Sequence, residues 1–343
     1  MKKLLLIFFF LGIVILAVGF FWLQGELNHT YRGPEMTFKI HNGDSFPKIN
    51  QSLYKQGVIS NRRVFHRYTQ YKNLLSKFKS GKYLIKDGMN LDDLINKFVT
   101  GDSIKNLVTI PEGKNLFEIA DILSEKKFLK DKDKKNFIKL ANSAEYAKKL
   151  GIDGVNLEGY LFPDTYNFEE DETPESLLRK MTDHFKSQTK NLDLSSTFLT
   201  PKEVITLASV VEKETGAKFE RKIIAGVFFN RLKKKMRLQS DPTIIYGMWE
   251  RYDGNIRKKD ILAPSKYNTY TIKSLPIGPI ANPGVDAIEA VLNPDSHDYL
   301  YFVSKNNGTH KFSKTLKEHN SAVRTWQLTK KNKKGRSWRD LKQ

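Results

Sequence analysis

The sequence contains no cysteine. This absence excludes disulfide bonds, metal sites built on thiolates and a cysteine nucleophile, and it suits an exported protein that folds without oxidation. Histidine offers no substitute, because His310 and His319 lack the spacing and the partner ligands of a metal site. We expect these two histidines to make structural hydrogen bonds, and we predict no metal site.

Acidic residues are few relative to basic ones: 38 Asp and Glu stand against 58 Lys and Arg, for a net charge of +20. Such an excess would suit a nucleic-acid-binding protein. The basic residues are scattered along the chain rather than gathered in one helix, however, and we interpret most of them as a solvated surface. An exported nucleic-acid binder stays an alternative that rests on charge alone.

One stretch lacks charged and polar residues altogether. Residues 4–23 form an apolar run of 20 residues, about the length that a helix needs to cross roughly 30 Å of hydrocarbon. The run ends in Phe-Phe-Trp-Leu rather than in the small residues of a signal-peptide cleavage site. We therefore predict a retained, single-pass membrane helix within residues 1–30. Lys2 and Lys3 precede it, which places the N-terminus in the cytoplasm and the rest of the chain outside.

Three segments before residue 130 share one pattern when they are aligned on Gly43, Gly88 and Gly113. Apolar residues five and three positions before each glycine alternate as in a half-buried strand. Apolar residues three, six and ten positions after it follow one face of a helix. Each segment is therefore predicted to form a strand, a glycine turn and an amphipathic helix. The apolar positions are Phe38, Ile40, Phe46, Ile49 and Leu53; Tyr83, Ile85, Leu91, Leu94 and Phe98; Val108, Ile110, Leu116, Ile119 and Leu123.

The third segment, VTIPEGKNLFEIA, resembles a LysM module, a small fold that binds glycans containing N-acetylglucosamine. A packing unit without glycan affinity would have the same periodicity, so both interpretations stay open. The polar residues 131–137 are predicted to form a solvated turn or a helix start. We assign residues 36–150 to a small LysM-like α/β repeat domain.

The segment TPKEVITLASVVEKETG, residues 200–216, has the start and stop signals of a helix. Thr200 can cap it, a proline follows at the first helical position, and Gly216 comes after its end. The expected buried face consists of Val204, Leu207, Ala208 and Val211.

Two carboxylates, Glu212 and Glu214, lie at the two edges of this buried face. Desolvation there raises a carboxyl pKa and leaves the group able to give a proton near neutrality. A salt-bridge cluster at the helix end is the competing interpretation of the same residues, with Lys213, Lys218 and Arg221 as cations. The helix alone does not decide between an acid and a helix end.

Further motifs follow in the second half. In LEGYLFPDTYNF, residues 157–168, Glu158 and Asp164 are candidate site carboxylates, but we favour turn and cap roles for them. RLQSDPTIIYG, residues 237–247, predicts a helix with Asp241 as its N-cap. Residues 267–284 predict a long loop stiffened by prolines, and residues 299–320 a β-hairpin around Asn307-Gly308.

Taken together, ASVVEKETG, RLQSDPTIIYG, YNTYTI, LPIGPIANPG and the later YLYFVS, HKFS and EHN resemble the endolytic murein transglycosylase (YceG-like) family. Two positions depart from its pattern: Ser274 stands where glycine is common, and Ile277 where a second proline is common. The resemblance implies an α+β protein with an N-terminal transmembrane helix, the LysM-like α/β repeat domain and a mixed α+β catalytic domain. We assign residues 155–325 to the catalytic domain and residues 326–343 to a basic tail.

The family cleaves the β-1,4 bond from N-acetylmuramic acid to N-acetylglucosamine in nascent peptidoglycan and leaves a 1,6-anhydro-muramyl end. The resemblance implies this lyase activity here, with a role in ending strand elongation. The second glutamate of EKET matches the family's catalytic residue, which implies Glu214 as the acid and base and Glu212 as a supporting or alternative residue. No cofactor is implied, because proton transfer and intramolecular attack need none.

The glycan cleft is expected to contain amides and hydroxyls for acetamido groups and aromatic rings for sugar faces. The predicted residues are Gln239, Asp241, Thr243, Tyr267, Asn268 and Asn282. The implied partners are peptidoglycan glycan strands, the lipid bilayer and peptidoglycan synthases. An ordinary hydrolase would need a second carboxylate, for which Glu212 and Asp241 are the candidates. The alternative function is a membrane-anchored, non-catalytic peptidoglycan-binding scaffold, which explains the anchor and the repeats but not Glu214.

Overall fold

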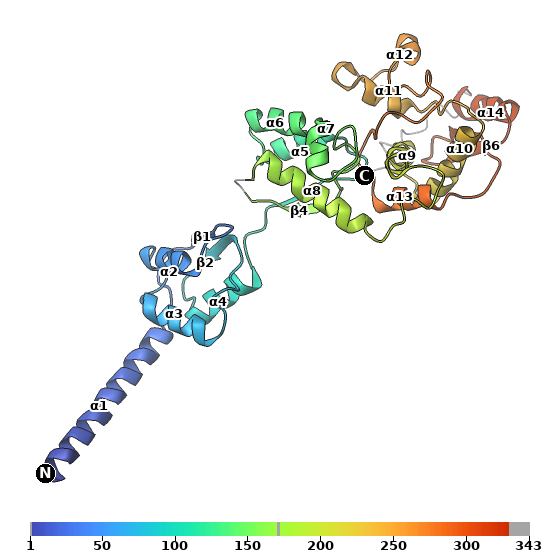
Figure 1. Ribbon diagram of the computed structural model, residues 1–343. Helices are drawn as coiled ribbons and strands as arrows, with labels where there is room; N and C mark the ends of the chain where they lie inside the picture. The colour runs from blue at the N-terminus through green and yellow to red at the C-terminus, as the bar shows by residue number, and fades with distance from the viewer. Residues whose placement is uncertain (1, 170–171, 329–343) are drawn as a thin grey trace. The chain divides into compact units, whose positions relative to one another are not determined.

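The computed structural model describes residues 2–169 and 172–328, which contain both helices and small antiparallel sheets. Its contacts divide the chain into two compact units between Asn106 and Leu107 (Figure 1). Each described sheet has two strands, so helices build most of both cores. The mixed α and β composition predicted from the sequence is confirmed. The division lies after residue 106, whereas the predicted repeat domain, residues 36–150, ended at residue 150.

The first unit begins with α1 (Lys2–Leu27), whose apolar side chains from Phe9 to Leu23 are mostly exposed. A helix that is apolar on all sides and unburied requires an apolar environment, so α1 is compatible with a membrane anchor. Its last turn is joined to the rest of the unit. Leu27 packs against the core of this unit, and the Ser60 hydroxyl donates a hydrogen bond of 2.6 Å to the Glu26 carboxylate.

The rest of the first unit is a strand-helix-helix-strand-helix arrangement. Its elements are β1 (Met36–Ile40), α2 (Phe46–Lys55), α3 (Arg62–Tyr71), β2 (Gly81–Ile85) and α4 (Leu91–Thr100). The two strands pair antiparallel, with Phe38 opposite Tyr83. All ten apolar positions predicted for the first two segments are buried. Gly43 and Gly88 have φ values of 83° and 81°, which explains why the turns need glycine.

The third segment also forms a strand, a glycine turn and a helix, but it belongs to the second unit. Its strand β3 (Leu107–Thr109) pairs with β4 (Thr165–Asn167), and its helix is α5 (Leu116–Glu125). Val108 and Ile110 are buried in the core of that unit. The predicted boundary near residue 150 is therefore wrong, because the partner strand of the third segment lies after it.

The second unit is mainly helical. Its other elements are α6 (Asp131–Ala141), α7 (Ala144–Lys149), α8 (Pro174–Thr189), α9 (Pro201–Glu214), η1 (Lys218–Glu220), α10 (Arg221–Lys233), α11 (Asp241–Gly247), η2 (Trp249–Arg251), α12 (Lys258–Leu262), α13 (Val285–Leu292), β5 (Tyr301–Ser304), β6 (His310–Ser313), α14 (Leu316–Val323) and η3 (Arg324–Leu328). Helices α9, α10 and α13 pack on one another in its centre (Figure 1). A long irregular loop connects α12 to α13, as predicted.

Helix α9 starts where the sequence predicts. The Thr200 hydroxyl accepts from the Glu203 amide, the Glu203 carboxylate accepts from the Thr200 amide, and Pro201 occupies the first turn. This capping box is a strong local start signal. The predicted buried face of α9 is confirmed, and Ile205, Ser209 and Val210 are buried as well. The helix is therefore enclosed on most sides, which fixes its last residue in place.

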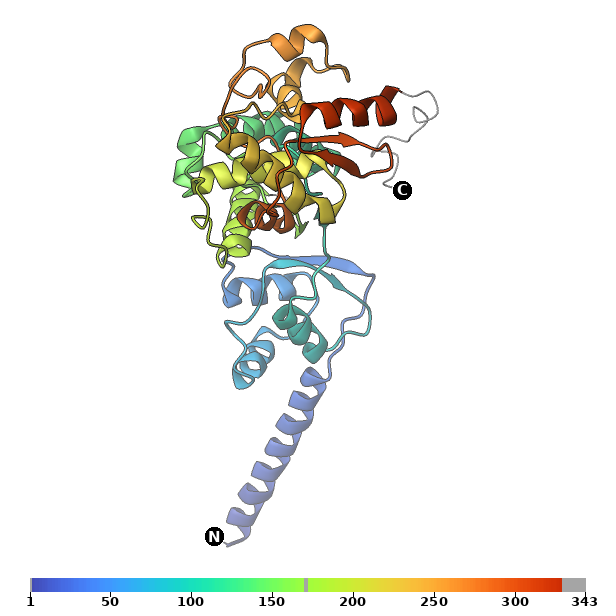
Figure 2. The same cartoon turned by 90° about the vertical axis from the view of Figure 1, so that its right-hand side faces the viewer.

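The hairpin of β5 and β6 is confirmed, with Ser304 opposite His310 across the turn, and α14 lies beside it (Figure 2). His310 makes the predicted structural hydrogen bonds: its Nδ1 lies 2.7 Å from a Glu220 carboxylate oxygen. His319 differs from the prediction. Its ring stacks on Tyr301, and its buried Nδ1 has no hydrogen-bond partner in the described part of the chain.

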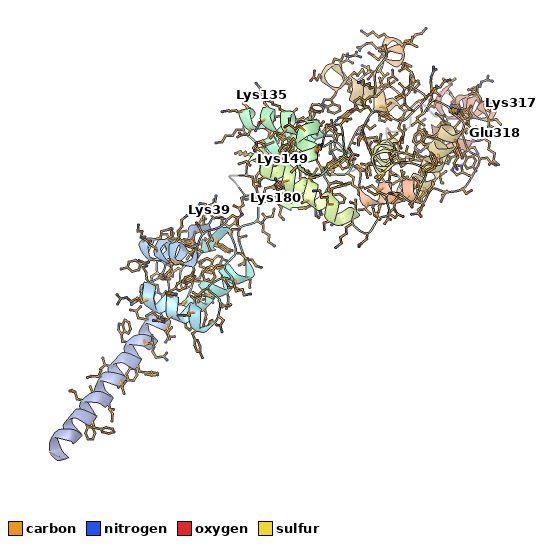
Figure 3. The ribbon with its side chains drawn as sticks, in the orientation of Figure 1. Lys39, Lys135, Lys149, Lys180, Lys317 and Glu318 are labelled. Atoms are coloured by element: carbon orange, nitrogen blue, oxygen red, sulfur yellow. The ribbon has the colours of Figure 1, made fainter. Side chains whose placement is uncertain are left out.

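The excess positive charge is spread over many elements. Figure 3 labels Lys39 on β1, Lys135 on α6, Lys149 on α7, Lys180 on α8 and Lys317 on α14. This distribution agrees with a solvated basic surface rather than one nucleic-acid-binding helix. The predicted basic tail lies outside the described residues from position 329 onward.

Candidate active site

Glu214 is the last residue of α9 and is half-buried. The chain leaves the helix directly after it, because Thr215 has an extended backbone (φ −139°, ψ 137°). The Ser240 hydroxyl donates a hydrogen bond of 2.5 Å to Oε1 of Glu214. A buried helix end and a neighbouring loop thus fix a single carboxyl group.

Burial raises the pKa of Glu214 to about 7, and the negative charge of Asp241 acts in the same direction. The hydrogen bond from Ser240 and the positive charge of Arg231 act in the opposite direction. A carboxyl group with this pKa holds its proton through much of the neutral range and can also lose it. This is the property that one group needs to act first as an acid and then as a base.

The loop before α11 presents Ser240 to Glu214. Gln239 has a φ of 50°, a conformation that non-glycine residues adopt rarely and at a cost. The Gln239 amide donates to the Thr269 carbonyl at 3.2 Å, and the Ser240 amide donates to the Thr269 hydroxyl oxygen at 2.9 Å. The fully buried Thr243 hydroxyl donates to the Ser240 carbonyl and lies 2.9 Å from the Thr269 hydroxyl. Thr243 therefore holds this loop from inside.

Asp241 is exposed next to this loop, and its carboxylate accepts a hydrogen bond of 2.6 Å from the Tyr270 hydroxyl. The sequence predicted Asp241 as the N-cap of its helix. That prediction is wrong: α11 begins at Asp241, Ser240 occupies the cap position, and neither side chain caps the helix. The hydrogen bond from the Tyr270 hydroxyl fixes the position of the Asp241 carboxylate instead.

Glu212, two residues before Glu214, faces a different neighbourhood. Its Oε1 lies 2.8 Å from Nη2 of Arg221, and both side chains are almost fully buried. Glu112 and Asp286 also lie within 3.5 Å of the Arg221 guanidinium. The Glu212 carboxylate additionally accepts from the Gly284 amide at 3.3 Å. The helix-end salt-bridge cluster therefore exists, but it is formed by Glu212.

Asn282 and Glu158 are both buried and are joined by a hydrogen bond. The Asn282 side-chain oxygen accepts from the amides of Gly159 and Leu161, and its amide group donates to Oε1 of Glu158 at 2.8 Å. Oε2 of Glu158 accepts from the amide of Leu116, the first residue of α5, so Glu158 bonds to the start of a helix outside its own segment. Burial raises the pKa of Glu158 to about 8.

Two more predicted residues lie in the long loop. Asn268 is buried, and its side-chain amide donates to the carbonyls of Asp260, Ile261 and Ala263. Tyr267 is half-buried, and its ring lies 4.8 Å from that of Tyr246, centroid to centroid.

The predicted residues thus fall into two groups. Gln239 and Asp241 are exposed next to Ser240, and Tyr267 is partly exposed. Thr243, Asn268 and Asn282 are buried and engaged within the protein. Ser240 and Tyr270 were not among the predicted site residues, although they lie inside the motifs RLQSDPTIIYG and YNTYTI.

Residues 38–325 match the YceG-like family. Two curated relatives are both named endolytic murein transglycosylase. The protein from Bacillus subtilis (strain 168) is 35% identical over 339 residues, which are 94% of this chain and 93% of that protein. The protein from Streptococcus pneumoniae (strain ATCC BAA-255 / R6) is 34% identical over 78% of this chain, which spans 54% of that longer protein.

A solved structure is also similar. The crystal structure of a YceG-like protein from Listeria monocytogenes aligns with a TM-score of 0.58 at 34% identity. The alignment covers 84% of this chain and 98% of that one.

Proposed function

Since the chain belongs to the YceG-like family, we propose that Glu214 is the residue with which it performs the family's reaction. The activity is endolytic murein transglycosylation, a lyase reaction that cuts murein glycan strands at internal bonds. The observation that supports Glu214 is its position: a half-buried carboxyl at a fixed helix end, with a pKa near 7 and a serine hydroxyl as its direct partner.

The proposed reaction needs one carboxyl group. The protonated Glu214 gives its proton to the glycosidic oxygen as the bond from the anomeric carbon breaks. The resulting carboxylate then takes the proton of the muramic acid 6-hydroxyl as that oxygen attacks the anomeric carbon. The sugar gains an internal 1,6-anhydro bond, no water is consumed, and Glu214 ends protonated as it began.

We propose different roles for the two groups of predicted cleft residues. Gln239, Asp241 and Tyr267 have exposed or partly exposed side chains and would contact sugar rings and acetamido groups. Thr243, Asn268 and Asn282 would hold the loops on which these residues lie, since their side chains bond within the protein.

Gln239→Ala should raise KM for glycan strands while the melting temperature of the protein stays constant, because the side chain is exposed. A lower melting temperature with an unchanged KM would contradict contact with the substrate.

We assign Glu212 the role of a positioning residue. Its ion pair with Arg221 and its bond to Gly284 fix the rotation of α9, so that Glu214, two residues later, faces Ser240. The engagement of its carboxylate with Arg221 supports this positioning role over the role of a second carboxylate in a hydrolase.

We propose that the first unit, which contains the first two of the three repeated segments, binds glycan strands. An open groove supports this role, and it follows the second glycine turn and one side of α4. Its lining includes Lys86, Gly88, Met89, Asn96 and Thr100.

Deleting residues 36–106 should therefore weaken binding to long glycan strands more than it slows cleavage of bound strands. Unchanged affinity in a pelleting assay would reduce this unit to a spacer.

We further propose that α1 spans the cell membrane with its N-terminus in the cytoplasm and both units outside, where nascent strands and the synthases that make them are found. The apolar run of the helix and the two lysines that precede this run support this orientation. Alkaline phosphatase, which folds only outside, should be active when it is fused after Gln343, whereas a cytoplasmic reporter there should be silent. The reverse pattern would overturn the orientation.

A further inference from the structure

We propose that Arg231 is a positioning residue of the active site, which fixes the loop of Ser240 and presents its positive charge to Glu214. This inference rests on the proposed role of Glu214. Arg231 lies on α10 and is only 6% exposed. A buried guanidinium group needs partners for its donors and its charge, so the identity of those partners indicates its role.

The first set of partners is backbone. Nε of Arg231 donates to the Leu300 carbonyl at 2.6 Å, and Nη1 donates to the Leu238 carbonyl at 2.6 Å. Leu238 lies two residues before Ser240, and Leu300 directly precedes β5. One side chain therefore connects α10 to the loop that places Ser240 on Glu214 and to the start of the hairpin. The planar guanidinium group of arginine has several N–H donors in fixed directions and makes both contacts at once. The single ammonium group of lysine cannot do this.

The second set of partners is electrostatic. The guanidinium carbon lies 5.3 Å from the ring centroid of Tyr301. Burial lowers the pKa of Arg231, while the carboxylate form of Glu214 acts in the opposite direction. The charged groups that act on Glu214 are Asp241 of α11 and Arg231 of α10, and Glu214 in turn acts on Tyr270 of the long loop. Arg231 is the cation of this set.

These contacts bear on the reaction because Glu214 becomes a carboxylate once it has given up its proton. A fixed, buried positive charge stabilises that carboxylate as it forms. It also sets the pH at which the free enzyme loses the proton. Arg231 favours the charged form and so lowers the pKa of Glu214. Removing its charge should raise that pKa, and activity should then extend to higher pH.

The test is the pH dependence of kcat/KM for the full chain in detergent, with purified glycan strands as substrate. The wild type should lose activity as pH rises through about 7. Arg231→Gln should move this alkaline limb upward by at least about 0.5 pH unit and lower kcat about tenfold or more. Arg231→Lys keeps the charge but loses the paired guanidinium donors. Its kcat should therefore fall, while the alkaline limb of its pH profile stays in place. Lys222→Gln, an exposed charge removed from the same helix, should change neither.

An unmoved limb in Arg231→Gln would overturn the electrostatic role. If that variant does not fold, Arg231→Lys decides alone: full activity would contradict the positioning role, and a displaced limb would contradict the role of charge. Failure of this inference is distinct from failure of the proposed function. The latter would appear as turnover by Glu214→Gln, whatever the Arg231 variants do.

Discussion

Glu214→Gln should abolish the release of 1,6-anhydro products while the protein stays folded. Glutamine has the size of glutamate and can still accept the hydrogen bond from Ser240, but it cannot exchange a proton during the reaction. General acid or base help is commonly worth about 10² to 10⁴ in rate, and here one residue performs both steps. We therefore expect a loss at or beyond the upper end of this range, measured as product release from purified strands.

Stability gives the control for this variant. The pKa of Glu214 is raised to about 7, so between its ordinary value and pH 7 the folded protein binds more protons than the unfolded chain. The contribution of Glu214 to stability therefore declines as pH rises through this window. Glutamine lacks that penalty, so the melting temperature should be unchanged or slightly higher near pH 7. A clear fall in melting temperature with full turnover would favour a structural role for Glu214.

Glu212→Gln is the matched variant on the same helix. It should lower activity less than Glu214→Gln does, because the Glu212 carboxylate positions the helix end and gives no proton to the substrate. Its main effect should be on stability. If the two variants exchanged these effects, the catalytic carboxyl would be Glu212.

Arg221→Met should cause the largest loss of stability among the substitutions considered. Arg221 is 4% exposed and pairs with the buried Glu212 carboxylate, with Glu112 and Asp286 close by. Removing the cation leaves a buried carboxylate without its partner beside two further acids, which typically costs about 3–5 kcal/mol. Trp249 and Trp326 lie in the second unit, so fluorescence during urea unfolding of the full chain should report this change.

Lys218→Met is the control for Arg221→Met. Lys218 pairs with Asp286 at 2.7 Å, but its side chain is largely exposed. Water already screens such a pair, so its removal should change unfolding little. Equal effects of the two substitutions would mean that the Arg221 cluster does not hold the end of α9.

Local periodicity predicted the repeating units well. All fifteen apolar positions aligned on Gly43, Gly88 and Gly113 are buried, and each segment forms the predicted strand and helix. These features depend on residues within about ten positions of each other. The division between units could not be predicted in the same way, because it depends on the pairing of Thr109 with Thr165, far apart in the sequence.

Prediction of the site from the sequence has the same limit, because local features can be predicted and long-range contacts cannot. The cap, the buried face and the edge position of Glu214 follow from one helix, and the sequence predicts them. Its actual partners do not follow, since Ser240 and Arg231 approach from a loop and from another helix. Asp241 illustrates the difference: an aspartate before a proline is a common cap, but a tyrosine 29 residues later takes its carboxylate. The helical course of α8 and α10 was also not predicted.

The central claim is that one carboxyl group, Glu214, cleaves murein without water. Mass spectrometry of the products from purified murein strands, treated with the full chain and with Glu214→Gln in water enriched in ¹⁸O, tests it most directly. We expect the wild type to release internal fragments that have 1,6-anhydro ends and contain no ¹⁸O, and we expect the variant to release no such fragments. Fragments with ¹⁸O-labelled reducing ends, or anhydro products from Glu214→Gln, would contradict it.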